Sequence, residues 1–196
     1  MTPAAARAAT LAALLCLLSA APAHADFLVA PFFAWTRNAE TERRVPGGGA
    51  TAEWTAGWLV AGGDLGYASG FFDPDEDVFD LVASSHVLTI GGHVGIGWPA
   101  PDEARFVPYL TGGFGWMRQQ ARDREGLADV TRSDPAFNLG GGVNVMFAPF
   151  LGIRADLRRF RSLRDPFEAP DPIVADLERL SFWRFSLGAV IRFGTN

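Results

Sequence analysis

The sequence has no lysine: its 17 basic residues are all arginine, and 22 acidic residues outnumber them. The net charge of −5 leaves little of the positive surface that nucleic acids bind, so we expect no nucleic-acid partner. The chain also lacks any apolar run of the ~18 residues that a transmembrane helix needs. Helical periodicity is missing as well, which argues against a helical bundle.

Cysteine occurs once, at Cys16, inside the apolar run 11–21. A single arginine precedes this run, and small residues follow it up to position 25, an order typical of a secretory signal peptide. We therefore predict a signal peptide over 1–25, with cleavage before Asp26. The run is too short for a membrane-anchoring helix, and the residue before Cys16 is not the small one of a lipoprotein signal. The exported domain, 26–196, then has no disulfide and depends on its core or on a membrane.

Alternation with a period of two residues recurs along this domain and predicts strands throughout. It is clearest near the C-terminus, where one face carries Trp183, Phe185, Leu187, Ala189, Ile191 and Phe193. Similar patterns occupy 88–98, 106–116, 137–147 and 151–158. Weaker ones cover 27–36, 49–55 and 58–69. The pattern predicts eight strands.

The face opposite the bulky apolar one is mostly glycine, with a few scattered polar and charged residues. A soluble barrel or sandwich would instead present densely charged residues there, facing water. A barrel of eight strands has room inside only for side chains, which suits small residues and a few paired charges. The large apolar face is then left to contact lipid. The pattern predicts an all-β fold, an eight-stranded antiparallel up-and-down transmembrane β-barrel.

The segments between the expected strands alternate in length, as they do in outer membrane barrels. Long segments are expected at 37–48, 70–85, 119–135 and 163–178. Shorter ones, at 55–57, 99–104 and 148–150, share the opposite end of the barrel with both termini. Aromatic residues gather near both ends, as membrane-interface girdles do. The predicted girdle residues are Trp35, Trp58, Tyr67, Trp98, Trp116, Phe147, Trp183 and Phe193.

Four short stretches resemble the outer-membrane-protein β-barrel domain family, the small OmpA- and OmpX-like barrels. They are 63–67 (GDLGY), 107–113 (VPYLTGG), 151–158 (LGIRADLR) and 182–188 (FWRFSLG). The resemblance covers the whole exported domain and implies a structural or surface-interaction role without catalysis or cofactor. It implies outer membrane lipids and lipopolysaccharide as partners, together with the barrel-assembly machinery. That machinery reads an aromatic last residue in this family, whereas Phe193 is followed by three further residues here.

Charged residues on the inward face are the main candidates for a functional site. They are Glu53, Asp64, Asp156, Arg154, Arg158, Arg184 and Arg192, with His93 and Asn144 of similar placement. They could line a narrow polar conduit. We favour the alternative, a packed ionic core that excludes water, because eight strands leave no open channel.

Other polar motifs carry less weight. The acidic segment 73–80 has the alternating carboxylates of a calcium loop, but Val78 and Ser84 replace the required glycine and glutamate. We expect a solvated loop and no metal. The run Ser84-Ser85-His86 could serve a lipid hydrolase, but strand alternation directs Ser85 and His86 to opposite faces. The glycines at 47–49 are read as a loop, and those at 140–142 as thinning the lumen face.

These observations favour a non-catalytic outer membrane barrel. Three alternatives stay open: a conduit for small apolar molecules through the barrel wall, a lipid A-modifying hydrolase, and a soluble periplasmic ligand-binding barrel.

Overall fold

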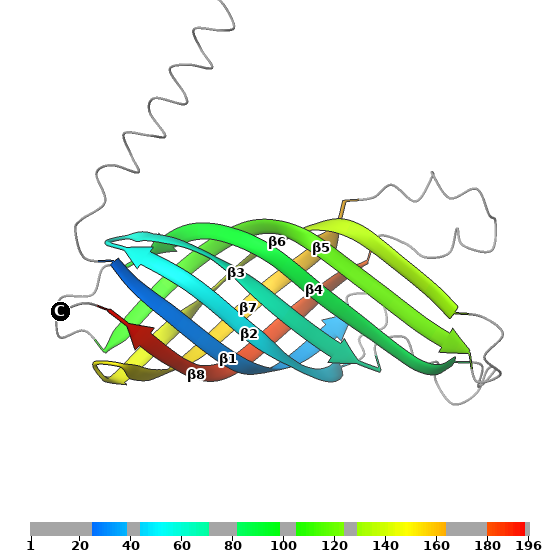
Figure 1. Cartoon of the computed structure of the whole chain (residues 1–196), viewed down its shortest axis with the longest axis horizontal. Coiled ribbons are helices and arrows are strands. Elements are labelled where there is room, and N and C mark those ends of the chain that lie inside the picture. Colours follow the sequence, from blue (N-terminus) through cyan, green and yellow to red (C-terminus); the bar gives the residue numbers. More distant parts are fainter. Residues whose placement is uncertain are drawn as a thin grey trace, which may run out of the picture.

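A computed structural model describes residues 25–38, 44–70, 82–98, 105–123, 129–163 and 180–194. Eight strands fill these ranges (Figure 1). They are β1 (Ala25–Asn38), β2 (Arg44–Ala56), β3 (Leu59–Ser69), β4 (Val82–Gly97), β5 (Phe106–Asp123), β6 (Asp129–Ala148), β7 (Leu151–Ser162) and β8 (Ser181–Phe193). No helix in these ranges is long and apolar enough to span a membrane. The predicted signal peptide lies outside the described residues except for Ala25, the first residue of β1.

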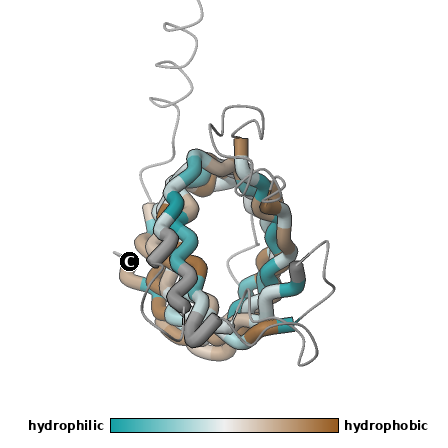
Figure 2. Tube along the Cα trace, turned by 90° about the vertical axis from the view of Figure 1, so that its right-hand side faces the viewer, coloured by the Kyte–Doolittle hydropathy of each residue, from teal (hydrophilic) through white to brown (hydrophobic). Residues whose placement is uncertain are grey.

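Each strand pairs antiparallel with the next, and β8 pairs with β1, so the sheet closes into a barrel. Viewed along its axis, the wall forms a ring (Figure 2). The predicted eight-stranded antiparallel barrel is confirmed. We call the end with the tight connections at 57–58 and 149–150 the turn end, and the opposite end the loop end. Gly57, with φ of 60°, supplies the left-handed residue that the two-residue turn between β2 and β3 requires.

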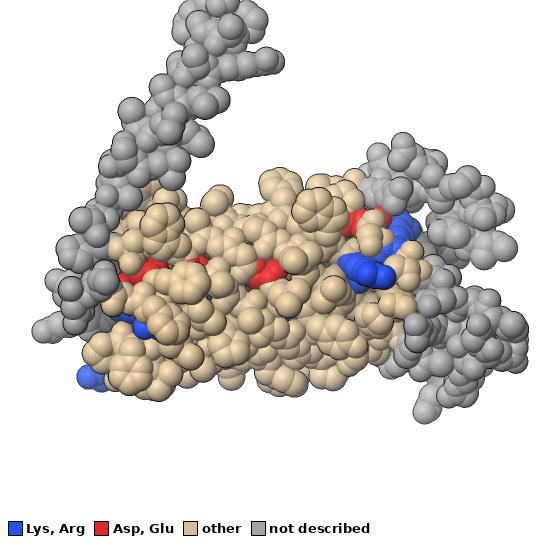
Figure 3. All heavy atoms as spheres, in the orientation of Figure 1, with Lys and Arg blue, Asp and Glu red and all other residues tan. Residues whose placement is uncertain are grey.

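Inward and outward residues alternate along the strands as the sequence predicts. In β8 every second residue from Phe182 to Ser186 is buried, whereas Trp183, Phe185 and Leu187 are exposed. The same alternation holds along β7, where Arg154 and Asp156 are buried on either side of Ala155. On the face seen in Figure 3, arginine atoms are visible near the two ends only, and the surface between them is uncharged apart from small acidic patches.

Glycine makes room for the large side chains inside the barrel. Gly62 lies between Glu53 and His93 in the ladder, and a Cβ added there would lie 2.8 Å from Cγ of Glu53. Gly140 pairs with Arg158 in the same way, and a Cβ added at Gly140 would lie 2.6 Å from Cγ of Arg158. The inner wall therefore pairs a large residue on one strand with glycine on the next, which is how a narrow barrel holds bulky charged groups.

Three connections predicted as long are shorter than expected, and in the least changed of them β4 begins at Val82, inside the expected loop 70–85. β2 begins at Arg44, so the glycines at 47–49 lie within a strand, and reading them as a loop was wrong. A Cβ at Gly49 would lie 2.6 Å from the Phe32 ring, so the glycine serves packing rather than a turn. Between β5 and β6 the ladder continues as far as the pair Arg122 and Asp129, where a loop over 119–135 was expected. This part of the hairpin is polar, and it lacks the apolar alternation by which strands were recognised.

Apolar side chains close the interior at both ends. At the turn end, Leu28, Ala30, Met146 and Val190 form one buried cluster. At the loop end, a larger cluster contains Val45, Ala68, Val87, Met117, Ala136, Phe160, Leu180 and Phe182. The rings of Phe160 and Phe182 stack there with centroids 5.0 Å apart. Most of the buried charged residues thus lie between two apolar layers, whereas Ser85, Gln119, Asp134 and Ser162 are buried on the loop-end side of the larger cluster.

Candidate functional site: a buried ionic cluster and an outer groove

Seven charged or titratable side chains meet between the apolar layers, and each residue is at most 5% exposed. They are Glu53, Asp64, His93, Arg154, Asp156, Arg158 and Arg184, contributed by β2, β3, β4, β7 and β8. We call this set the ionic cluster. Three carboxylates face three guanidinium groups, so the cluster is balanced in charge if His93 is neutral.

Glu53 contacts three other members of the cluster, Arg154, His93 and Arg158. Arg154 binds it with both terminal nitrogens, at 2.5 Å and 2.7 Å, in the two-pronged geometry that matches a guanidinium to a carboxylate. His93 Nε2 lies 2.8 Å from Oε1, and Nη2 of Arg158 lies 3.6 Å from the same oxygen. Removing the Glu53 carboxylate would therefore leave several buried donors without their acceptor.

The neighbours of His93 determine its tautomer. Nη1 of Arg158 lies 3.2 Å from Nδ1 of His93, and a guanidinium can only donate. Nδ1 must therefore accept, which leaves Nε2 to carry the proton and donate it to Glu53. In this tautomer His93 bridges Arg158 and Glu53.

Asp156 and Asp64 tie the rest of the cluster together. Asp156 accepts from Nε of Arg158 at 3.0 Å and from the Tyr109 hydroxyl at 2.7 Å. Nη2 of Arg184 donates to Asp64 at 2.5 Å. Arg158 lies 3.7 Å from Asp64 and thus connects the two halves. The contacts form one continuous network across the interior.

Three partners of the cluster were not predicted from the sequence. The Tyr109 ring lies under Arg154, with the guanidinium carbon 4.3 Å from the ring centroid. Thr89 accepts from Nη1 of Arg184 at 3.3 Å, and the Phe32 ring lies 5.0 Å from the same guanidinium group. All three occupy inward positions on their strands, so alternation places them in the interior. Their contacts depend on how the barrel closes.

Arg192, the eighth predicted residue, lies away from the ionic cluster. Its Nε is 3.6 Å from Asp26 near the turn end, and both side chains are about one third exposed, at 33% and 38%. Asn144, named beside the cluster, is buried, but its Oδ1 has no hydrogen-bond partner among the described residues. Inward direction alone does not bring a residue into the cluster, because its level along the barrel axis also matters.

The predicted girdle residues all lie on the outer wall and are at least 40% exposed. Trp58, Trp98, Phe147 and Phe193 are near the turn end, and Trp35, Tyr67, Trp116 and Trp183 are near the loop end. Between the two sets, the outer wall carries exposed Leu65, Ile90, Val94, Leu110, Leu139, Ile153 and Leu187. The outer wall thus has an apolar band bounded by two girdles of aromatic residues, the arrangement typical of a barrel wall in lipid.

Ser85 and His86, the two residues of the Ser84-Ser85-His86 run whose side chains are described, do not form a catalytic pair. The Ser85 side chain is buried inside the barrel, whereas His86 lies against the Tyr67 ring on the outer side, with centroids 5.5 Å apart. A nucleophile and its base must lie within hydrogen-bond reach of each other. The side chain of Ser84 and the acidic segment 73–80 lie outside the described residues.

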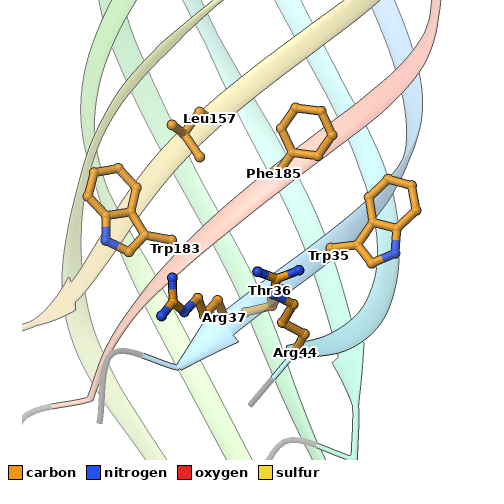
Figure 4. Close-up of a pocket in the computed structure, with 7 residues that line it drawn as sticks. All are labelled: Trp35, Thr36, Arg37, Arg44, Leu157, Trp183 and Phe185. Atoms are coloured by element: carbon orange, nitrogen blue, oxygen red, sulfur yellow. The ribbon is translucent and has the colours of Figure 1, made fainter. Parts of the chain in front are cut away.

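A groove of about 600 Å³ opens on the outer wall at the loop end (Figure 4). We call it the loop-end groove. It is lined by Trp35, Thr36, Arg37, Arg44, Leu157, Trp183 and Phe185. Two indole rings flank two arginine side chains, and Phe185 and Leu157 lie farther from the loops. Both tryptophans were predicted to be girdle residues, whereas no role was predicted for Arg37 and Arg44.

The chain has the fold of the small eight-stranded outer membrane barrels. It is similar to Neisserial surface protein A, with a TM-score of 0.63 and 13% identity over 86% of this chain and 97% of that one. It is also similar to Ail, the attachment invasion locus protein of Yersinia pestis, with a TM-score of 0.56 and 13% identity over 87% and 98%. The N-terminal barrel domain of Pseudomonas aeruginosa OprF gives a TM-score of 0.51 and 14% identity over 86% and 97%. No family model and no curated protein sequence matches the chain.

Proposed function

We propose that the chain is an integral outer membrane barrel with a structural or surface-interaction role and no catalytic activity. The observation that carries this proposal is the arrangement of the barrel wall. Its outer face has an apolar band between two aromatic girdles, and it encloses the ionic cluster. In water, this arrangement would expose many large apolar side chains and bury the charges. In a bilayer, lipid covers the band and the charges pair inside. The wall is therefore a poor match for a soluble ligand-binding barrel, in which these apolar side chains would face water.

Among the described residues, one candidate opening for the passage of small molecules through the wall lies between β1 and β8, and it is filled. The pairing of β1 with β8 is interrupted at Ala30 and Pro31, where proline has no N–H to donate. Ala30 and Val190 are buried there, at 1% and 0% exposure, within the turn-end apolar cluster. The interruption therefore faces packed side chains and no open route, which favours the structural role.

The first prediction concerns the closed barrel in lipid. The protein, purified in detergent and left unheated, is expected to migrate differently in gel electrophoresis from the boiled protein, because a closed sheet has no edge from which to unfold. Extraction should require detergent. Protein that is extracted by buffer alone and shows one mobility before and after boiling would support the soluble alternative instead.

The second prediction concerns catalysis. Ser84→Ala, Ser85→Ala and His86→Ala are each expected to leave the lipid A of a producing cell unchanged, because the proposed function includes no catalytic step and Ser85 and His86 lie on opposite sides of the wall. Mass spectrometry of extracted lipid A, compared with cells that carry the wild-type chain and with cells that lack it, is the measurement. A modified lipid A species that needs the wild-type chain and disappears in any of the three variants would establish an enzyme.

A further inference from the structure

Among the described side chains of the outer wall, positive charge at the loop end is concentrated around the loop-end groove. The ladders place Arg159, Trp183, Arg37 and Arg44 side by side on β7, β8, β1 and β2. All four side chains are exposed, and the Arg159 guanidinium lies 5.7 Å from the Trp183 ring centroid. Neighbouring strands are about 4.8 Å apart, so the row spans roughly 14 Å along the wall. We call it the arginine row.

The row directly below, toward the turn end, is wholly apolar. It consists of Leu157, Phe185, Trp35 and Pro46 on the same four strands. The rings of Trp35 and Phe185 stack there at 5.9 Å. Two residues along a strand advance about 7 Å, so the step from charged to apolar surface takes place within the loop-end groove. The groove offers cations at the headgroup level and an apolar floor beneath them.

Among the side chains that the structure describes, the other half of the barrel does not repeat this arrangement. The corresponding outward row on β3, β4, β5 and β6 is Tyr67, Leu88, Arg118 and Ser133, with one arginine where the first half has three. A general preference for arginine at the membrane interface would place it on both halves. The concentration on one side points to a ligand bound at that side.

This step rests on the proposed function, which places the loop end at the outer leaflet. We propose that the loop-end groove binds lipid A of the outer leaflet, an acylated disaccharide that carries a phosphate at each end. The arginine row faces the phosphates, with which guanidinium groups form strong charge-assisted hydrogen bonds. The apolar row holds the first part of one acyl chain. A glycerophospholipid has a single bridging phosphate and would use only part of a row of this width.

The test uses the exported domain refolded in detergent micelles. Native mass spectrometry measures the binding of bisphosphorylated lipid A, of the same lipid A without its phosphates, and of phosphatidylglycerol. The wild type is expected to bind bisphosphorylated lipid A in preference to the other two. Arg37→Gln combined with Arg44→Gln should weaken this binding about tenfold, since each exposed ionic contact contributes modestly. Arg118→Gln, the matched control on the other half, should bind as the wild type does.

Two further measurements separate folding from binding. Heat-modifiable migration shows whether each variant forms the closed barrel, and Arg37→Lys with Arg44→Lys should retain most of the binding because the charges remain. Raising the salt to about 1 M should weaken wild-type binding, since charges are then screened beyond about 3 Å. A folded Arg37→Gln and Arg44→Gln variant that binds normally would overturn the proposal, as would equal binding of all three lipids. A wild type without heat-modifiable migration would instead contradict the proposed function itself.

Discussion

Glu53→Ala is expected to lower the free energy of unfolding by about 3–5 kcal/mol, because it leaves buried positive charge unpaired. Arg154 loses both of its short contacts, and His93 loses the acceptor for its Nε2 proton. Reversible urea unfolding in lipid vesicles measures the change. Glu53→Gln should lower the free energy of unfolding by less, since the amide oxygen still accepts a hydrogen bond from one guanidinium nitrogen.

A matched control for this prediction exists in the same chain. Asp26 and Arg192 form an ion pair at the turn end with both side chains about one third exposed. Asp26→Ala is expected to lower the free energy of unfolding by about 1 kcal/mol or less, because water replaces the carboxylate that Arg192 loses. If the interior were a hydrated conduit, Glu53→Ala would cost as little as Asp26→Ala, and salt would screen both.

Removing both members of the main pair provides a second check. Glu53→Leu with Arg154→Leu leaves two carboxylates and two arginines, so the remaining cluster stays balanced. The double variant should be more stable than the sum of its single changes predicts, with a coupling energy of up to ~3 kcal/mol. Additive effects would mean that Glu53 and Arg154 stabilise the barrel separately and that the network is not one unit.

The direction of each side chain could be read from the sequence, because a strand alternates with a period of two. Arg154, Asp156 and Arg158 follow one another at that period in β7, and all three are buried in the interior. Their partners could not be read in this way. Glu53 and Arg154 are 101 residues apart, and their contact depends on the stagger of strands that only the closed barrel sets.

Glycine and apolar residues on the inner face were the features that sequence reasoning placed least well. Glycines suggest turns, and this misled the assignment at 47–49, where the narrow interior rather than a turn requires them. Phe160 and Phe182 lie on the same face as the arginines and close the loop end of the interior. An apolar residue on a polar face had no obvious role until the barrel showed that the ionic cluster lies between two apolar layers.

The second large effect concerns the outer wall. Ala155 lies midway along β7 with apolar Val143 and Leu187 as its neighbours in the ladder. Ala155→Arg is expected to lower the free energy of unfolding in lipid vesicles by about 2–4 kcal/mol, because it places a charge in the hydrocarbon core. Ser69→Arg, at the loop-end limit of β3, is the control and should cost about 0–1 kcal/mol, since the charge reaches the headgroups there.

Labelling of single cysteines tests the same geometry without relying on stability. The exported domain has no other cysteine, so one placed at 153, 154, 155 or 156 reports its own surroundings. Ile153 and Ala155 face outward, and cysteines at these positions should react with a lipid-soluble reagent in vesicles. Cysteines at Arg154 and Asp156 should not react, because both side chains are buried inside. In a soluble barrel, water-soluble reagents would reach the outward positions, and Ala155→Arg would be tolerated because an arginine there would face solvent.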